Sequence, residues 1–463
     1  MSRIWAFLGV IILALALSGC GGEEGAEEGV GVGVEAEPTA AAGPVTINFW
    51  HSEPAENETT LKRLIDRFNA SQDQVKVRLF FQGNVQDIFL KLLASLPSGD
   101  VPALVELVEG QFQSMVDSGG VTPVQEFIDA EGYDLSDFDE KLVDYYTADD
   151  KLYAMPIGVS VPMLYYNKIH FREVGLDPEK PPLTLDDVRA YSEKLLKIDS
   201  AGNVVRSGLA LDLSAWYLEI ILAEHGDLYV NNNNGRDGRP TEVLFNGPTG
   251  QALFRWWDEM VDSGLAFNVG RNPSGADALL AVGAGRAAMT FSSSSALRSV
   301  VSVVEAGLEG MELGVGPFPG VTGGSGKPGV GSRALWIMNQ RSEAEQRAAW
   351  QLARWLAEPE QQAEFFAGTG HLPARQSAYQ LEAARQVLER YPYYRVPADL
   401  FVGTPSTLAR LGPRIGPGKM VREIVAHALE EMVVGGKDPV QALNEAADRA
   451  TKELQGYNQR LGE

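Results

Sequence analysis

Apolar positions between residues 45 and 108 switch between two spacings. Residues 45–49, 75–81 and 103–108 are short runs rich in β-branched and aromatic side chains, which predicts three strands. Between the runs, apolar side chains recur three or four residues apart, which predicts two helices. The order strand, helix, strand, helix, strand predicts the start of a parallel α/β sheet. The helical positions are Leu61, Leu64, Ile65 and Phe68, then Ile88, Leu92 and Leu96.

Glu109 directly follows the third predicted strand. In open α/β sheets, ligands bind beyond the carboxyl ends of the strands, so this glutamate is the strongest single candidate for a binding residue. The same argument places Trp50, His51, Gly83 and Asn84 near a site, because they follow the first and second strands.

The middle and end of the chain are richer in helical spacing. Residues 186–196 and 250–263 are amphipathic and predict helices. Residues 231–238 are polar and rich in turn formers, which predicts a solvated surface loop. A final helix is predicted after Asp438, with Gln441 placed for a capping box.

One short apolar strand, residues 334–338, lies far along the chain from the first three, behind a segment rich in Gly and Pro. An isolated late strand indicates a return to the first sheet, so that each of two lobes is built from separate pieces of chain. We expect an N-terminal lobe from residues 45–157 and about 329–367, and a C-terminal lobe from about 158–328 and 368–463.

The first twenty residues have the order of a membrane-targeting signal. Arg3 precedes an apolar run, residues 4–17, which is too short to span a bilayer, and two small residues then precede Cys20. This order resembles a bacterial lipoprotein signal, which implies cleavage before Cys20 and a lipid on its sulfur. An ordinary secretory signal is the alternative. We expect residues 1–19 to be the signal peptide and residues 20–44, rich in Gly and Glu, to be a flexible acidic tether.

Length and charge narrow the class of protein. The 463 residues allow two domains with their own cores. A formal net charge of −23 argues against binding to nucleic acid or to an anionic membrane surface, because both need basic patches. The lipid on Cys20 is then the one expected membrane contact. Cys20 is also the sole cysteine, so the chain forms no internal disulfide.

Sequence motifs of common enzymes and metal sites are missing. The glycine-rich stretch 323–327 lacks the first glycine of a phosphate loop, and Pro328 stands where a Ser or Thr would meet magnesium. There is no Gly-x-Ser-x-Gly elbow, and the five histidines are never paired at metal-ligand spacing. We therefore expect no enzyme, no cofactor and no metal. A secreted hydrolase with a carboxylate pair is the alternative from another class.

Several short motifs occur in one order from residue 45 to the C-terminus. Together they resemble the extracellular solute-binding proteins of ABC importers, the large family that includes maltose-binding protein, and they are most similar to its glycerol-3-phosphate-binding branch. The motifs are Phe49-Trp50-His51-Ser52, Arg67-Phe68-Asn69-Ala70, Leu164-Tyr165-Tyr166-Asn167-Lys168, Gly175-Leu176-Asp177-Pro178, Pro181-Pro182-Leu183-Thr184, Ala288-Met289-Thr290, Ser293-Ser294, Ala334-Leu335-Trp336-Ile337-Met338, Gly370-His371-Leu372-Pro373 and Arg414-Ile415-Gly416.

The resemblance implies an α/β fold of the periplasmic-binding-protein-like type II, with two lobes, a hinge and a ligand cleft between the lobes. Binding closes the hinge in such proteins, because the ligand contacts both lobes only in the closed state. It further implies a monomer, anchored to the cell membrane in the periplasm or on the outer cell surface, which passes a small-molecule ligand to the ABC permease. The implied ligand is glycerol-3-phosphate or a glycerophosphodiester; an oligosaccharide is the alternative.

The resemblance also carries ligand-binding residues onto this sequence. It implies that Glu109 accepts hydrogen bonds from glycerol hydroxyls and that Trp216 forms an apolar wall. It implies that Arg414 clamps a phosphate with two parallel N–H donors. The other implied contacts are the hydroxyls of Ser160, Ser293 and Ser294.

Five positions depart from the family's pattern. Val85 replaces a tyrosine and Leu213 falls where a second tryptophan is expected. A Gly-Gly pair becomes Gly followed by Ser332 and Arg333, and His371 replaces a second tyrosine. Ser332, Arg333 and His371 are therefore further candidate ligand-binding residues. The changes leave three ligands open: a phosphate held by other donors, a larger phosphodiester such as a glycerophosphocholine-like headgroup, or an uncharged sugar.

Overall fold

The first three strands, β1, β2 and β3, pair in parallel, as the sequence predicts. In the computed structural model, β1 lies between β2 and β3, and the late strand β14 returns beside β3 in the antiparallel direction. β14 also pairs with β4 and β7. The sheet order is β2-β1-β3-β14-β4, with β7 beside β14. The strands are β1 (Val45–His51), β2 (Val75–Phe81), β3 (Leu104–Val108), β4 (Val121–Thr122), β7 (Met155–Ser160) and β14 (Gly331–Met338).

A second six-stranded sheet is built from the middle of the chain. Its order is β11-β10-β12-β8-β13, with β9 paired to β10. β10 pairs in parallel with β11 and β12, whereas β8 runs antiparallel to β12 and β13. The strands are β8 (Pro162–Asn167), β9 (Lys197–Ile198), β10 (Val204–Leu211), β11 (Ala266–Asn268), β12 (Ala287–Ser293) and β13 (Leu313–Pro317); β5 (Thr147–Ala148) and β6 (Lys151–Leu152) form a separate pair.

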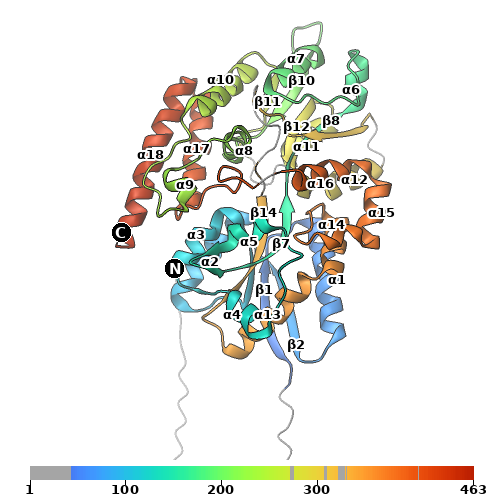
Figure 1. Ribbon diagram of the computed structural model, residues 1–463. Coiled ribbons are helices and arrows are strands. Elements are labelled where there is room, and N and C mark those ends of the chain that lie inside the picture. Colours follow the sequence, from blue (N-terminus) through green and yellow to red (C-terminus); the bar gives the residue numbers. More distant parts are fainter. Residues whose placement is uncertain are drawn as a thin grey trace, which may run out of the picture. The chain divides into compact units, whose positions relative to one another are not determined.

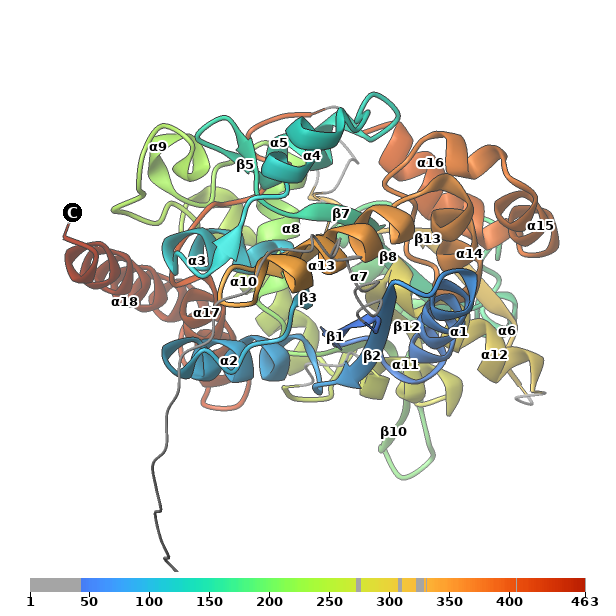
Figure 2. The ribbon, with the colours of Figure 1, turned by 90° about the horizontal axis from the view of Figure 1, so that it is seen from below.

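Helices cover both sheets. In Figure 1 the first sheet lies in the lower half with α1 to α5, and the second lies in the upper half with α6, α7, α8, α10 and α17. α1 packs against β2, and α13 packs against β1 and β14 (Figure 2). The helices are α1 (Ala55–Ser71), α2 (Val85–Ser95), α3 (Phe112–Asp117), α4 (Gln125–Glu131), α5 (Glu140–Tyr146), α6 (Lys168–Glu173), α7 (Leu185–Leu195), α8 (Trp216–His225), α9 (Asn231–Gly235), α10 (Pro248–Asp262), α11 (Ala276–Gly283), α12 (Leu297–Glu305), α13 (Glu343–Leu356), α14 (Pro359–Thr369), α15 (Glu382–Arg390), α16 (Arg395–Val402), α17 (Gly418–Val433) and α18 (Pro439–Arg460).

The structure describes residues 43–271, 276–306, 310–321, 329, 331–404 and 406–462, with Pro44–Glu463 as one compact unit. The predicted signal peptide, Cys20, the tether up to residue 42 and the stretch 323–327 therefore lie outside the described residues. No helix within the described ranges is both long and apolar enough to cross a membrane.

Each sheet has its own hydrophobic core. Ile47, Phe49 and Trp336 are fully buried in the first core, and Tyr166 and Trp257 are buried in the second. Tyr166 and Trp336, which belong to two of the sequence motifs, therefore serve packing. Burying large aromatic side chains contributes most of the favourable free energy in such cores.

The chain crosses directly from the first sheet to the second between β7 and β8. At the crossing, the backbone N–H of Val161 donates to the Oγ of Ser294 (3.1 Å), and the N–H of Ser294 donates to the carbonyl oxygen of Val161 (2.8 Å). Ser294 is fully buried there. This reciprocal pair ties the crossing strand to the end of β12.

Two local predictions hold only in part. The carboxylate of Asp438 accepts from the N–H of Gln441 (2.9 Å), as predicted for a helix cap. The Gln441 side chain, however, turns to Glu445 (2.8 Å) instead of closing a capping box. The prediction of a solvated loop at residues 231–238 was wrong for Asn234, which is 1% exposed.

Candidate functional site

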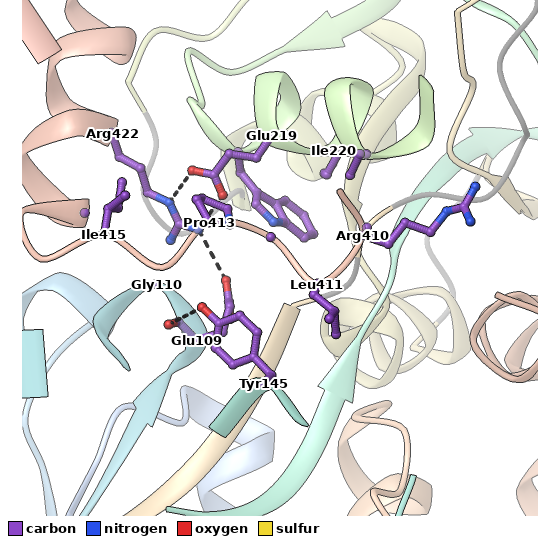
Figure 3. Close-up of a pocket in the computed structure, with 15 residues that line it drawn as sticks. Glu109, Gly110, Tyr145, Glu219, Ile220, Arg410, Leu411, Pro413, Ile415 and Arg422 are labelled. Carbon is purple, nitrogen blue, oxygen red and sulfur yellow. Dashed lines mark hydrogen bonds and ion pairs between the residues drawn. The ribbon is translucent and has the colours of Figure 1, made fainter. Parts of the chain in front are cut away.

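A small cavity lies where the two lobes meet, at the carboxyl end of β3 (Figure 3). Glu109 and Tyr145 reach it from the first lobe, and Trp216, Glu219 and Arg422 reach it from the second. The cavity measures about 40 Å³, which holds only a few water molecules. Its other lining residues are Gly110, Ile220, Ala223, Gly329, Arg410, Leu411, Gly412, Pro413, Ile415 and Gly418.

Arg422 joins two carboxylates across this cavity. Its Nε and Nη2 donate to the two oxygens of Glu219, each at 2.7 Å, and Nη2 also donates to Glu109 at 3.3 Å. Burial opposes the charge of Arg422, but Glu219 and Glu109 outweigh it and hold the pKa of the guanidinium above its ordinary value. A side chain at Gly110 would clash with Arg422, because its Cβ would lie 2.7 Å from Nη1. The bridge therefore links the lobes through one shared guanidinium.

Glu109, Ser160 and Ser332 meet around Gly331. The Oε2 of Glu109 accepts from the N–H of Ser332 (2.9 Å). A Cβ at Gly331 would lie 2.8 Å from the Oγ of Ser160 and 3.6 Å from the Oε2 of Glu109, so the glycine lets these groups approach. The Ser332 hydroxyl itself bonds to the Tyr146 hydroxyl (2.9 Å) and lies inside the first lobe.

A second cavity, of about 270 Å³, shares Trp216 and Arg422 with the first in its lining. It is lined by Ser293 and by two of the positions that depart from the family's pattern, Val85 and Leu213. The Oγ of Ser293 accepts from the N–H of Ser295 (3.2 Å) and caps a helical turn there. Trp216 and Arg422 thus line both cavities.

Arg414 does not line either cavity. Its Nη2 donates to the carbonyl oxygens of Asp144 and Tyr145 (2.8 Å for the latter), which lie at the end of α5 in the first lobe. Its guanidinium lies 5.1 Å from the ring centre of Phe112 and 5.9 Å from that of Tyr145. Arg236 also lies over the Tyr145 ring, at 5.9 Å. Burial and the neighbouring Arg414 lower the pKa of Arg236 to about 10.

Arg333 and His371 lie in a buried ionic cluster beside the first sheet. Arg333 contacts Glu53 (3.1 Å) and Glu106 (2.5 Å), and the Nε2 of His371 lies 3.2 Å from Glu53. The side chains of Glu53 and Glu106 are at most 1% exposed, and that of Arg333 is 12% exposed. The cluster joins the end of β1, β3, β14 and the loop after α14.

The cluster carries nearly balanced charge. Burial raises the pKa of Glu106 to about 8, against the opposing effect of Arg333 and with the help of the Glu53 charge. Burial also opposes ionisation of Glu53, but Arg333 and His371 outweigh it and hold its pKa well below the usual range. Burial lowers the pKa of His371. These shifts favour a charged Arg333 and Glu53 beside a neutral Glu106.

Glu106→Gln is expected to remove a pH dependence of stability. Because the folded-state pKa of Glu106 lies above its ordinary value of 4.5, its contribution to stability is complete below that value and is lost as pH rises to about 8. Relative to the variant, the wild-type protein should lose free energy of unfolding between about pH 5 and about pH 9. Urea titrations at both pH values measure this, and equal losses in both proteins would show that Glu106 is already ionised.

Of the residues that line the first cavity, Glu109 and Trp216 were predicted from the sequence, whereas Glu219, Arg422 and Tyr145 were not. Glu219 follows Trp216 by three residues on α8, so the two share one helix face. That spacing was the available signal for Glu219. Arg422 has no comparable signal, because a single arginine in an amphipathic helix usually faces solvent.

Comparison with known proteins identifies relatives over nearly the whole chain. Residues 63–391 match the family of bacterial extracellular solute-binding proteins. The sn-glycerol-3-phosphate-binding periplasmic protein UgpB of Pectobacterium atrosepticum is 30% identical over 89% of this chain and 92% of its own length. The protein of the same name from Salmonella typhimurium is 30% identical over 89% of this chain and 93% of its own.

Solved structures share the fold at lower identity. UgpB from Mycobacterium tuberculosis in complex with glycerophosphocholine has a TM-score of 0.75 at 22% identity, over 90% of this chain and 100% of that one. The GacH receptor of Streptomyces glaucescens, studied unliganded and with acarbose, has a TM-score of 0.74 at 18% identity, over 89% of this chain and 99% of that one. These likenesses confirm the predicted two-lobed α/β fold.

Proposed function

Because the chain belongs to the family of bacterial extracellular solute-binding proteins, we propose that it captures a glycerol phosphoester between its lobes and delivers it to the permease of an ABC importer. The relatives that cover nearly the whole chain are named for sn-glycerol-3-phosphate. The related structure from Mycobacterium tuberculosis holds glycerophosphocholine. These names support a glycerol phosphoester as the ligand proposed for this chain.

One observation supports an anionic ligand most directly: arginines gather at the cavity in a strongly acidic chain. Arg410 and Arg422 line it, and Arg236 and Arg414 lie behind its Tyr145 wall. The whole chain carries a formal net charge of −23. A local concentration of guanidinium groups in such a chain is the chemistry that binds phosphate.

The cavity residues suit the parts of a glycerol phosphoester. Arg422 supplies N–H donors for phosphate oxygens, and Glu109 and Glu219 accept from glycerol hydroxyls. Trp216 offers an apolar face to the carbon chain. The bond from Arg422 to Glu109 (3.3 Å) is longer than those to Glu219 (2.7 Å), so Glu109 is the partner that a phosphate replaces.

The small cavity requires a conformational change for ligand entry. A space of about 40 Å³ is far below the several hundred Å³ of typical ligand pockets. Separation of the lobes breaks the bond between Arg422 and Glu109 and opens the space between Tyr145 and Trp216. Closure around the ligand then follows from contacts that both lobes make with it.

The proposal includes the cellular setting. The protein acts outside the cytoplasm as a monomer without enzymatic activity, and a lipid on Cys20 anchors it to the membrane, with residues 20–44 as tether. The hinge separates an N-terminal lobe (residues 45–157 and about 329–367) from a C-terminal lobe (about 158–328 and 368–463). Ser160, Ser293, Ser294, Ser332, Arg333, His371 and Arg414 complete or support the site.

An oligosaccharide is the second candidate ligand. The second cavity, at about 270 Å³, is larger than the first, at about 40 Å³, and has Val85 and Leu213 in its lining. Of the related structures, GacH binds acarbose and a Thermotoga maritima protein binds maltose, the latter with a TM-score of 0.72 at 18% identity over 89% of this chain and 100% of that one. Aromatic stacking on Trp216 would hold a sugar ring in the same cleft.

Calorimetric titration of the purified protein distinguishes the two ligands. We expect saturable heat from sn-glycerol-3-phosphate or glycerophosphocholine, weakened by inorganic phosphate, because the phosphate group competes for the same arginines. Maltose and trehalose should give none. Heat from a sugar alone, unaffected by phosphate, would retain the transport role and reject the phosphoester. Turnover of any of the four compounds would reject the binding-protein function itself.

A further inference from the structure

The short element α9 (Asn231–Gly235) is an unusual left-handed turn, and residues 231–236 contact a segment that lines the cavity between the lobes. Asn232, Asn233 and Asn234 have φ values of 53°, 51° and 55°, and Gly235 follows at 79°. Residues other than glycine avoid this region of positive φ, and among them asparagine tolerates it best. A run of such residues is rare, and it persists only where the surrounding structure holds it.

Asn234 is the residue that holds the turn. Its Oδ1 accepts from the N–H groups of Tyr229 (2.8 Å) and Val230 (3.1 Å), which closes the turn on its own start. Its Nδ2 donates outward to the carbonyl oxygen of Leu408 (3.1 Å). The carbonyl oxygen of Asn234 accepts from the N–H of Arg414 (2.9 Å). Both ends of the segment 408–414 are thus attached to one buried asparagine.

The rest of the turn contacts the same segment between those ends. Arg236 donates to the carbonyl oxygens of Gly412 (2.8 Å) and Leu411 (3.3 Å). Gly235 lies against the carbonyl of Arg414, because a Cβ built there would be 2.2 Å from that oxygen. The segment 410–413 lines the cavity between the lobes.

We propose that residues 231–236 are a positioning device for the cavity-lining segment 410–413, so that Gly235 and Arg236 set ligand affinity without touching the ligand. The strained turn presents Asn234, Gly235 and Arg236 to one short segment, in a geometry that a right-handed turn does not offer. The effect on affinity rests on the proposed function. The effect on segment 408–414 does not, and it is measured without a ligand.

Gly235→Ala tests the device, with Gly175→Ala as its matched control. Both glycines have positive φ, 79° and 74°, so both substitutions strain the backbone to a similar degree. Only the Gly235 variant meets an atom, since a Cβ at Gly175 has nothing within 4 Å. Any difference between the variants beyond strain therefore reports the contact with Arg414.

Hydrogen exchange of the full-length protein is the first measurement. In Gly235→Ala we expect the amides of segment 408–414, above all that of Arg414, to exchange about tenfold faster than in wild type, with the control unchanged there. Calorimetry with glycerophosphocholine and sn-glycerol-3-phosphate should show a dissociation constant raised about tenfold in Gly235→Ala alone. Similar melting temperatures of the two variants would separate this loss from general destabilisation.

Each outcome decides one part of the inference. Unchanged exchange in segment 408–414 would overturn the positioning role. Faster exchange with unchanged affinity would overturn the link to the ligand. If wild type binds neither phosphoester, the proposed function fails while the exchange comparison still stands. Should Gly235→Ala not fold, Arg236→Met removes the donors to Gly412 and Leu411 and must produce the same exchange pattern.

Discussion

Replacing Arg333 with Met is expected to lower the free energy of unfolding by about 3–5 kcal/mol. Arg333 is the cation that both Glu53 and Glu106 contact, and those carboxylates are at most 1% exposed. Without the guanidinium, the Glu53 charge remains buried with a single partially effective partner, His371, whose own pKa is lowered by burial. An uncompensated buried charge is among the costliest single changes a protein can suffer.

Urea unfolding of Arg333→Met measures this loss, with Arg347→Met as control. Arg347 pairs with Glu343 on the surface of α13, where both side chains are mostly exposed (62% and 78%), so its loss should cost little. Adding Glu53→Gln to Arg333→Met should recover part of the stability, because it removes the orphaned charge. A loss similar to that of Arg347→Met would mean that water reaches the cluster and screens it.

Arg422→Met is expected to weaken phosphoester binding by about 2–5 kcal/mol, which is roughly 30-fold to several thousand-fold in the dissociation constant. The substitution removes the donor for the phosphate and leaves Glu109 and Glu219 without the cation that both contact. Both effects weaken the binding of an anionic ligand. An uncharged sugar would lose far less affinity. The ratio of the affinities for phosphoester and sugar therefore reports the effect of the Arg422 charge directly.

Arg189→Met is the control variant for the calorimetry of Arg422→Met. Arg189 pairs with Glu193 and Glu259 on the surface of the second lobe and lines neither cavity. Its variant should bind as wild type does. An unchanged dissociation constant for a phosphoester in Arg422→Met would remove Arg422 from the site and leave the phosphate to the other arginines.

The sequence predicted the elements that depend on local pattern. Runs and spacings gave β1, β2 and β3 with their helices, and the isolated apolar run 334–338 correctly indicated the return of β14 to the first sheet. Glu109 was found because the end of a parallel strand is a position defined by topology. These inferences required only the spacing of apolar residues, the turn residues and the order of the strands.

Features that depend on long-range packing were not predictable. Arg333 follows Ser332 in one strand, and alternation puts them on opposite faces, but the pattern does not show which face meets Glu53 and Glu106. Arg422 reads as an ordinary charge on a helix until its ion pair with Glu219 joins α17 to α8. Asn234 reads as solvated, because its burial arises from a distant partner, the carbonyl of Leu408.

A crystal structure of the protein with glycerophosphocholine would show whether Arg422 holds the phosphate between the lobes. We expect the phosphate within hydrogen-bonding distance of Arg422, roughly 3 Å, with the glycerol carbons against Trp216 and the bond between Arg422 and Glu109 broken. A ligand bound away from Arg422, or an intact bond between Arg422 and Glu109 in the loaded protein, would contradict it.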